Sequence, residues 1–99
     1  VILLAIRASE SVGFVQLYPS FSSVAMQRLW ILNDLFVTKS ARHEGVGMAL
    51  MQEAQRFAAE TDASRLVLAT ATDNRAAQAL YEKMGWIRDN AFIHFKYDL

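Results

Sequence analysis

The segment Arg42-His43-Glu44-Gly45-Val46-Gly47 combines basic side chains with two glycines where an amphipathic helix is expected to begin. Glycine lets the backbone approach a ligand closely, and the first N–H groups of a helix have no partner within it. Arg42, with Lys39 just before it, adds charge to the positive end of the helix dipole. We therefore expect this turn to hold an anion such as a pyrophosphate. The pattern is neither a Walker loop nor the three-glycine dinucleotide fingerprint.

Asn33 and Asp34 are polar residues that interrupt the apolar run Leu29–Val37. Burying them unpaired would be costly, so each should have a partner or face a cleft. Two interpretations stay open. The pair forms hydrogen bonds at a β-bulge, or Asp34 attracts a cationic ligand and takes its proton. A bulge here would free backbone groups of the strand for a ligand that lies alongside it, or for an oxyanion.

Tyr81 lies on the apolar stripe of a second predicted helix, which Asp73 or Asn74 caps and Gly85 ends. Its ring can be purely structural, or its phenol can donate a proton to a leaving group. The only histidines are His43 and His94, and we assign neither a catalytic role. No spacing of His, Asp and Glu favours a metal site, so we expect none.

Hydrophobic periodicity predicts an α/β fold in the order β-β-β-α-β-α-β-β, with a twisted, mixed and mostly antiparallel sheet and two helices. The expected strands are 1–7, 12–18, 26–37, 65–70, 86–88 and 91–99, with 19–23 as a loop and a possible bulge at Gly13. The first three should form an antiparallel meander, and the fourth should lie parallel to the third. Where those two strands splay apart, we expect a cleft with the anion-binding turn at its mouth.

Composition narrows the possible functions. The chain has 99 residues, 54% hydrophobic and 20% charged, which predicts one domain, residues 1–99, with one core. Ten basic and ten acidic residues cancel, which argues against a nucleic-acid partner or an anionic membrane surface. Cysteine is absent, which excludes disulfides and fits a cytoplasmic protein. No apolar run is long enough to span a membrane. The apolar first strand, VILLAI, leads us to expect a homodimer.

Two motifs carry a family resemblance. Residues 42–47 fit R-x-x-G-x-G, and residues 74–86, NRAAQALYEKMGW, place Leu-Tyr-x-Lys-x-Gly and an aromatic after an Asn. In this order they resemble the two signatures of the GNAT superfamily of N-acetyltransferases. LNDLFV is similar to the LEDLFV of the small-amine and polyamine-type branch, with Asn33 in place of a Glu. The resemblance implies the C-terminal two thirds of the family fold, with a strand and one or two helices preceding Val1.

The resemblance implies an enzyme that transfers the acetyl group of acetyl-CoA to a primary amine of a small molecule or peptide by direct attack in a ternary complex. Tyr81 would protonate the departing thiolate, Asp34 would also be catalytic, and Asn33 and Asp34 would bind the acceptor. Asn74 would contact the coenzyme if Asp73 took the helix cap. The implied coenzyme contacts are Leu35, Phe36, Val37, Arg42, His43, Glu44, Gly45, Val46, Gly47, Met48, Asn74, Tyr81 and Lys83. The alternative is a catalytically impaired acyl-CoA-binding or regulatory fragment.

Overall fold

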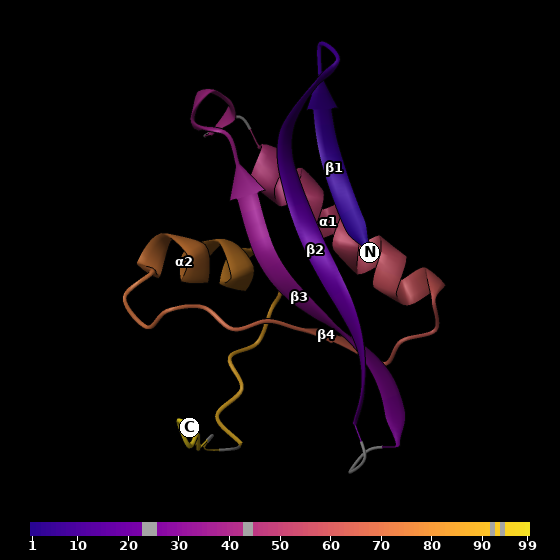
Figure 1. Cartoon of the computed structure of the whole chain (residues 1–99), viewed down its shortest axis with the longest axis vertical. Coiled ribbons are helices and arrows are strands. Elements are labelled where there is room, and N and C mark those ends of the chain that lie inside the picture. Colours follow the sequence, from indigo (N-terminus) through magenta and orange to yellow (C-terminus); the bar gives the residue numbers. More distant parts are fainter. Residues whose placement is uncertain (23–25, 43–44, 92, 94) are drawn as a thin grey trace. The chain divides into compact units, whose positions relative to one another are not determined.

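The computed structural model describes residues 1–22, 26–42, 45–91, 93 and 95–99. They form two compact units, Val1–Ala69 and Thr70–Leu99. The first unit contains β1 (Ile2–Arg7), β2 (Glu10–Ser22), β3 (Gln27–Val37), the 3₁₀ helix η1 (Lys39–Ala41), α1 (Val46–Glu60) and β4 (Arg65–Val67), and the second contains α2 (Arg75–Lys83) (Figure 1). This is the expected mixed α/β fold, in the order β-β-β-α-β-α. Within the described ranges, no helix is long and apolar enough to cross a membrane.

The sheet has the strand order β1-β2-β3-β4. Strands β1, β2 and β3 pair antiparallel, and β3 pairs with β4 in parallel, which confirms the predicted meander and the strand–helix–strand unit. The parallel pairing is short, because it runs only from Leu29 opposite Arg65 to Ile31 opposite Val67. Among the described residues, β3 therefore continues to Val37 with no strand beside it on that edge.

Helix α1 packs on one face of the sheet, as its apolar spacing predicts (Figure 1). The buried apolar residues of the described chain are Val12, Val15, Leu17, Leu32, Ala41, Leu50, Met51, Ala54 and Ala58. Gly13 of β2 lies against the start of α1, and only glycine fits there. A Cβ on Gly13 would lie 2.8 Å from the Phe36 carbonyl oxygen and 3.1 Å from a Leu50 methyl carbon. The start of α1 is thus seated directly against β2 and β3.

Two strand boundaries differ from the prediction. Residues 19–22, expected as part of a loop, belong to β2, where Pro19 stands opposite Trp30. The pairing with β1 reaches only as far as Gln16, so the outer side of β2 is an edge near Pro19, where a residue without an N–H is tolerated. Strand β4 ends at Val67 instead of residue 70, since its pairing with β3 stops there.

The described residues at the end of the chain form neither of the two strands predicted there. Residues 86–88 contain no strand, and neither do the described residues of the range 91–99. Alternating apolar residues suggested a strand, but Ile93, Phe95, Tyr97 and Leu99 are all at least 84% exposed. Alternation of apolar and polar residues is typical of a strand within a sheet. It does not by itself form a strand, because a strand also needs a neighbouring strand to pair with.

Candidate active site

A β-bulge interrupts β3 at the position that the polar pair suggested. Val15 of β2 stands opposite Leu35 and Gln16 opposite Asn33, so Asp34 is the extra residue. Asp34 has φ 54°, in the left-handed region that side chains seldom adopt. The other described non-glycine residues with positive φ, Ala8, Ser9, Met26 and Asp62, lie in turns, whereas Asp34 lies inside a strand. The expectation of a bulge near Asn33 and Asp34 is therefore confirmed.

The bulge lies just beyond the last residue of β3 that pairs with β4. Ile31 is that last paired residue, so the edge of Leu35, Phe36 and Val37 has no strand partner in the described chain. Backbone donors and acceptors on such an edge can pair with an extended ligand as though it were an added strand. A cleft at this place stays a prediction, because the cavity described below lies elsewhere.

The turn after β3 contains a short helix and a glycine N-cap. Lys39–Ala41 form η1, and Gly45 at φ 80° is the N-cap of α1. A Cβ on Gly45 would meet nothing within 4 Å, and one on Gly47 would meet only a Val37 methyl carbon at 3.9 Å. No side chain of the described residues caps the helix, and its first turn, which includes Val46 and Met48, contains no acidic residue. As far as the structure describes it, the backbone at the helix start is thus open, and no carboxylate of the first turn neutralises its dipole.

The basic residues of the turn are exposed. Arg42 donates from Nε to the Val37 carbonyl oxygen at 3.2 Å, which ties the turn to the end of β3 and holds the guanidinium beside it. Lys39 is also exposed, in η1. His43 and Glu44, both named as coenzyme contacts, lie outside the described residues, as does His94. Among the described residues, no three His, Asp or Glu side chains gather as metal ligands would.

Asn33 and Asp34 partner each other and are both exposed. The Asn33 amide Nδ2 donates to Asp34 Oδ2 at 3.4 Å, a long hydrogen bond. The first interpretation made from sequence, a hydrogen-bonded pair at a bulge, is confirmed. The second, that Asp34 attracts a cationic ligand and takes its proton, stays a prediction. The exposed carboxylate can attract a cation.

Helix α2, in the second unit, carries the remaining predicted residues. Asn74 is its N-cap, with Oδ1 accepting a hydrogen bond from the Ala77 N–H at 3.2 Å. We expected Asn74 to be available to a coenzyme only if Asp73 capped the helix. Asn74 is itself the cap, but capping does not occupy its whole side chain. The cap uses the amide oxygen, while the amide nitrogen can still donate. Lys83 is exposed in the last turn of α2.

Tyr81 is fixed by the way α2 ends. The Trp86 N–H donates to the Tyr81 carbonyl at 2.9 Å and the Gly85 N–H to that of Glu82 at 3.1 Å, with Gly85 at φ 92°. This is a Schellman motif, and its usual apolar contact is the pair of Tyr81 and Trp86 rings, with centroids 6.0 Å apart. The ring is half-buried, and burial raises the pKa of the Tyr81 phenol. The phenol is therefore a proton donor at neutral pH.

The residues of β2 that stand beside Asn33 and Asp34 were not predicted from the sequence. Gln16 stands directly opposite Asn33, and Phe14 opposite Phe36. The Phe14 and Phe36 rings lie 5.8 Å apart between centroids. Only the strand register identifies these neighbours, and the register depends on placing the bulge at Asp34 and not merely near it.

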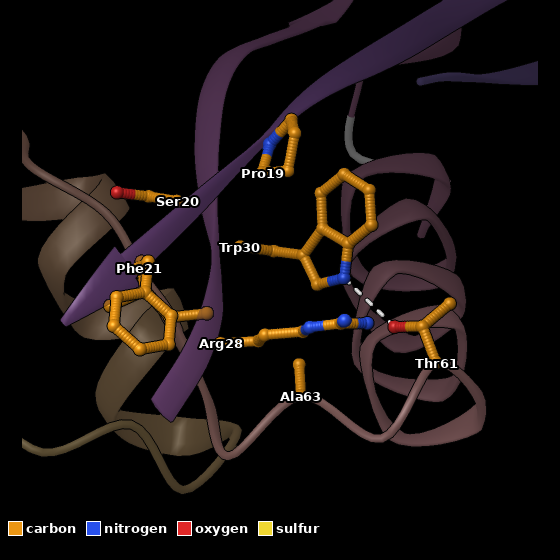
Figure 2. Close-up of a pocket in the computed structure, with 8 residues that line it drawn as sticks. Pro19, Ser20, Phe21, Arg28, Trp30, Thr61 and Ala63 are labelled. Carbon is orange, nitrogen blue, oxygen red and sulfur yellow. Dashed lines mark hydrogen bonds between the residues drawn. The ribbon is translucent and has the colours of Figure 1, made fainter. Parts of the chain in front are cut away.

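A cavity of about 470 Å³ lies at the other end of β3, near its start (Figure 2). Its walls include Phe21, Arg28 and Trp30, and the Trp30 indole Nε1 donates to Thr61 Oγ1 at 2.8 Å. From Trp30 to Val37 the strand extends about 20 Å. The cavity is thus separate from the turn that follows β3.

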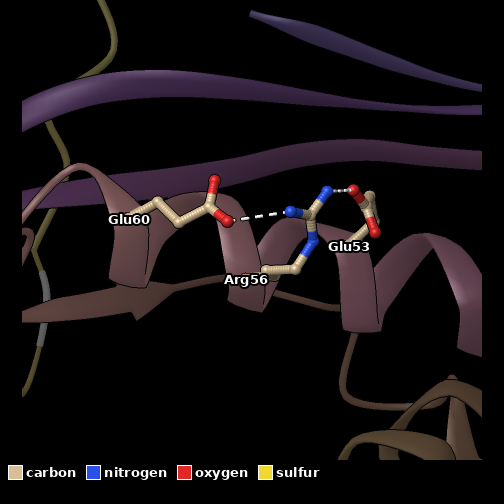
Figure 3. A network of polar contacts seen from close by, with 3 residues as sticks. All are labelled: Glu53, Arg56 and Glu60. Carbon is tan, nitrogen blue, oxygen red and sulfur yellow. Dashed lines mark hydrogen bonds and ion pairs between the residues drawn. The ribbon is translucent and has the colours of Figure 1, made fainter.

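The outer side of α1 carries an ion-pair network (Figure 3). Arg56 pairs with Glu53 and, at 2.8 Å, with Glu60, and all three side chains are exposed. The hydrogen bond from Arg56 lowers the pKa of Glu53, and the two carboxylates raise that of Arg56. The charge of Arg56 is therefore paired within α1, whereas Arg42 belongs to none of the ion pairs between described residues.

The strand that bulges after losing its partner and the glycine turn at the helix start are the two features that the sequence motifs led us to expect. The family model "Acetyltransferase (GNAT) family" matches residues 1–86, and the chain belongs to this family. An uncharacterized N-acetyltransferase of Bacillus subtilis (strain 168), YhfO, is 47% identical over 95 residues, which are 96% of this chain. The chain spans 64% of the length of YhfO.

Solved structures agree on the fold. The crystal structure of a probable acetyltransferase has a TM-score of 0.89 at 42% identity, and the match covers 99% of this chain and 66% of that one. A putative acetyl transferase from Pyrococcus furiosus has a TM-score of 0.83 at 31% identity, over 98% of this chain and 64% of that one.

Proposed function

We propose that this chain transfers the acetyl group of acetyl-CoA to a primary amine by direct attack in a ternary complex. One observation carries the proposal: β3 loses its neighbour after Ile31, bulges at Asp34 and then leads into the Gly45 turn. A single continuous segment thereby offers backbone partners for an extended arm and donors for a pyrophosphate. Both groups occur in coenzyme A.

The residues present fit the donor. Arg42 and the first backbone N–H groups of α1, from Val46 to Met48, would hold the pyrophosphate, and the openness at Gly45 and Gly47 leaves room for it. The backbone of Leu35, Phe36 and Val37 would pair with the pantetheine arm. Asn74 and Lys83 of α2 complete the proposed contacts. His43 and Glu44 retain the role that the motif implies.

The reaction needs one base and one acid. The amine nitrogen forms a bond to the acetyl carbon while the bond from that carbon to sulfur breaks. The proton lost by the amine goes to Asp34, directly or through water, and the departing thiolate takes a proton from the Tyr81 phenol. A backbone N–H freed at the bulge would donate to the carbonyl oxygen as it gains charge. A general acid must carry its proton, and the raised pKa of Tyr81 is compatible with this role because it keeps the phenol neutral.

Ligand-dependent stability and thiol release together test the proposal. Coenzyme A and acetyl-CoA should both raise the melting temperature, and at about 100 times Kd each adds ~2.7 kcal/mol. Free thiol should then form from acetyl-CoA when amines are added. No thermal shift at millimolar coenzyme A would refute the donor assignment. A shift without thiol release from any amine would leave a binding protein and not an enzyme.

Arg42→Gln sharpens the test, because it separates the pyrophosphate from the pantetheine arm. Coenzyme A should bind about tenfold more weakly, a loss of about 1.4 kcal/mol, while a phosphate-free pantetheine analogue binds unchanged. Arg56→Gln is the matched control, since it removes the same charge from the outer side of α1. Equal losses for both ligands, or for both variants, would place Arg42 outside the site.

A further inference from the structure

The face of the sheet turned away from α1 carries three neighbouring cross-strand pairs of β2 and β3. The pairs are Phe14 with Phe36, Gln16 with Asn33, and Tyr18 with Ile31. Residues directly opposite on antiparallel strands point to the same face, and neighbours along a strand alternate. Because Val15, Leu17 and Leu32 are buried on the α1 side, these pairs occupy the other face.

Asp34 adds one carboxylate to this face. A regular strand would turn consecutive side chains to opposite faces, but the bulge brings Asp34 within hydrogen-bond distance of Asn33. The Asn33 amide donates to it at 3.4 Å, and both side chains are exposed. In the described part of the chain, no Lys or Arg forms an ion pair with Asp34. The carboxylate is therefore available to a cation from outside the protein.

The surface around this carboxylate is apolar and aromatic. Along β3, Phe36 follows it and Ile31 precedes it, with exposed fractions of 46% and 38%. Across on β2, Tyr18 is 43% exposed, and Phe14 packs its ring against that of Phe36. The Tyr18–Ile31 pair thus borders the polar pair on one side, and the Phe14–Phe36 pair borders it on the other. Apolar surface beside one charge is the usual make-up of a site for a ligand with an apolar body and a single opposite charge.

We propose that this face binds the amine acceptor, and that the acceptor is an arylalkylamine, with one ammonium group on a short chain and an aromatic ring. This inference rests on the proposed function and names its substrate class. The ammonium pairs with Asp34, and the ring lies against Tyr18 and Ile31, the cross-strand pair next to that of Gln16 and Asn33.

A polyamine fits this face poorly. Its second ammonium would lie against the same aromatic surface, and the neighbouring polar residue is Asn33, which has no charge to offer it. Moving an ammonium group from water to a surface that offers it no partner costs free energy. The resemblance of LNDLFV to the polyamine-type branch therefore does not extend to its substrate, because the Glu of that branch is the residue replaced here.

The test compares phenethylamine with putrescine in two assays. In the first, 15N chemical-shift changes report binding without acetyl-CoA, with 3-phenylpropionate as a probe of the same shape and opposite charge. Phenethylamine should shift Gln16, Asn33 and Asp34 amides, and 3-phenylpropionate should not. In the second, kcat/KM with acetyl-CoA should favour phenethylamine over putrescine by about tenfold or more.

Tyr18→Ser supplies the variant, because Tyr18 has no assigned part in donor binding or proton transfer. It should lower kcat/KM for phenethylamine by about tenfold and leave methylamine unchanged, since methylamine has no ring to lose contact. Phe21→Ser is the matched control, an exposed aromatic of β2 that faces the other way, opposite Arg28. Preference for putrescine, equal binding of 3-phenylpropionate, or equal losses for both variants would overturn the inference while leaving the acetyl transfer intact. Failure of coenzyme A to bind would instead overturn the proposed function, and the binding assay would still test this face.

Discussion

The Tyr81 side chain has two separable parts. Its ring packs on that of Trp86, and its hydroxyl has a pKa that burial raises. Tyr81→Phe keeps the ring contact and removes only the hydroxyl. If the hydroxyl protonates the thiolate in the transition state, kcat should fall by about 10²- to 10³-fold. Stability and coenzyme A affinity should change little. Steady-state kinetics, with a coenzyme A titration on the same variant, measures both quantities, and a fully active variant would remove Tyr81 from the mechanism.

The pH dependence of the same variant checks the pKa. Because burial raises the pKa of Tyr81 above its ordinary value of about 10, its share of stability is complete below that pH and is lost as the pH rises through the higher folded value. The wild type should therefore lose stability more steeply than Tyr81→Phe at alkaline pH. Parallel curves from urea unfolding at a series of pH values would mean that burial has no such effect.

Helix α2 depends on a residue beyond its last turn. Gly85 at φ 92° closes the Schellman motif, and Ala in that conformation costs about 1 kcal/mol. Gly85→Ala should lower the free energy of unfolding by that amount and also lower kcat, because the end of the helix that carries Tyr81 is disturbed. Gly47→Ala is the control, since Gly47 lies inside α1 and its added Cβ would meet only Val37 at 3.9 Å. That control should stabilise the fold in urea unfolding and weaken coenzyme A. The opposite order of stabilities would contradict the assignment.

The elements that sequence could predict are those fixed by local chemistry. Residue spacing gave α1 and its apolar face, Asn74 and Gly85 marked the ends of α2, and the polar pair in an apolar strand marked the bulge. The terminal strands were predicted wrongly, because a strand needs a partner that its own residues do not encode.

The candidate site shows the same division. The turn from Arg42 to Gly47 was visible as a motif, since its chemistry lies within six consecutive residues. Phe14, Gln16 and Tyr18 were not, because they come beside Asn33 and Asp34 only through the register of β2 on β3. That register is shifted by one residue at the bulge, and a shift of one residue changes which face every later side chain occupies.

For the whole molecule, the open side of the sheet predicts self-association. Strand β1 is the first strand of the sheet, and its side chains Ile2, Leu4 and Ile6 are 58%, 57% and 66% exposed. Soluble proteins protect such edges with charges, prolines or bulges. β1 contains no charge or proline before Arg7, and the bulge in its pairing with β2, between Ala5 and Ile6, places the extra residue, Val12, on β2. We therefore expect two copies to pair along β1 as a homodimer.

Leu4→Lys tests this dimer, because a lysine on an edge strand opposes pairing with another chain while its long stem still covers the sheet. Light scattering at micromolar concentration should give twice the monomer mass for the wild type and the monomer mass for Leu4→Lys. Ile87→Lys is the control, since Ile87 is 90% exposed and belongs to the second unit. This variant adds the same charge outside β1, so it should remain dimeric. A monomeric wild type would show that exposure of this edge is not enough to drive pairing, and dissociation by both variants would mean that net charge, and not the β1 edge, controls association.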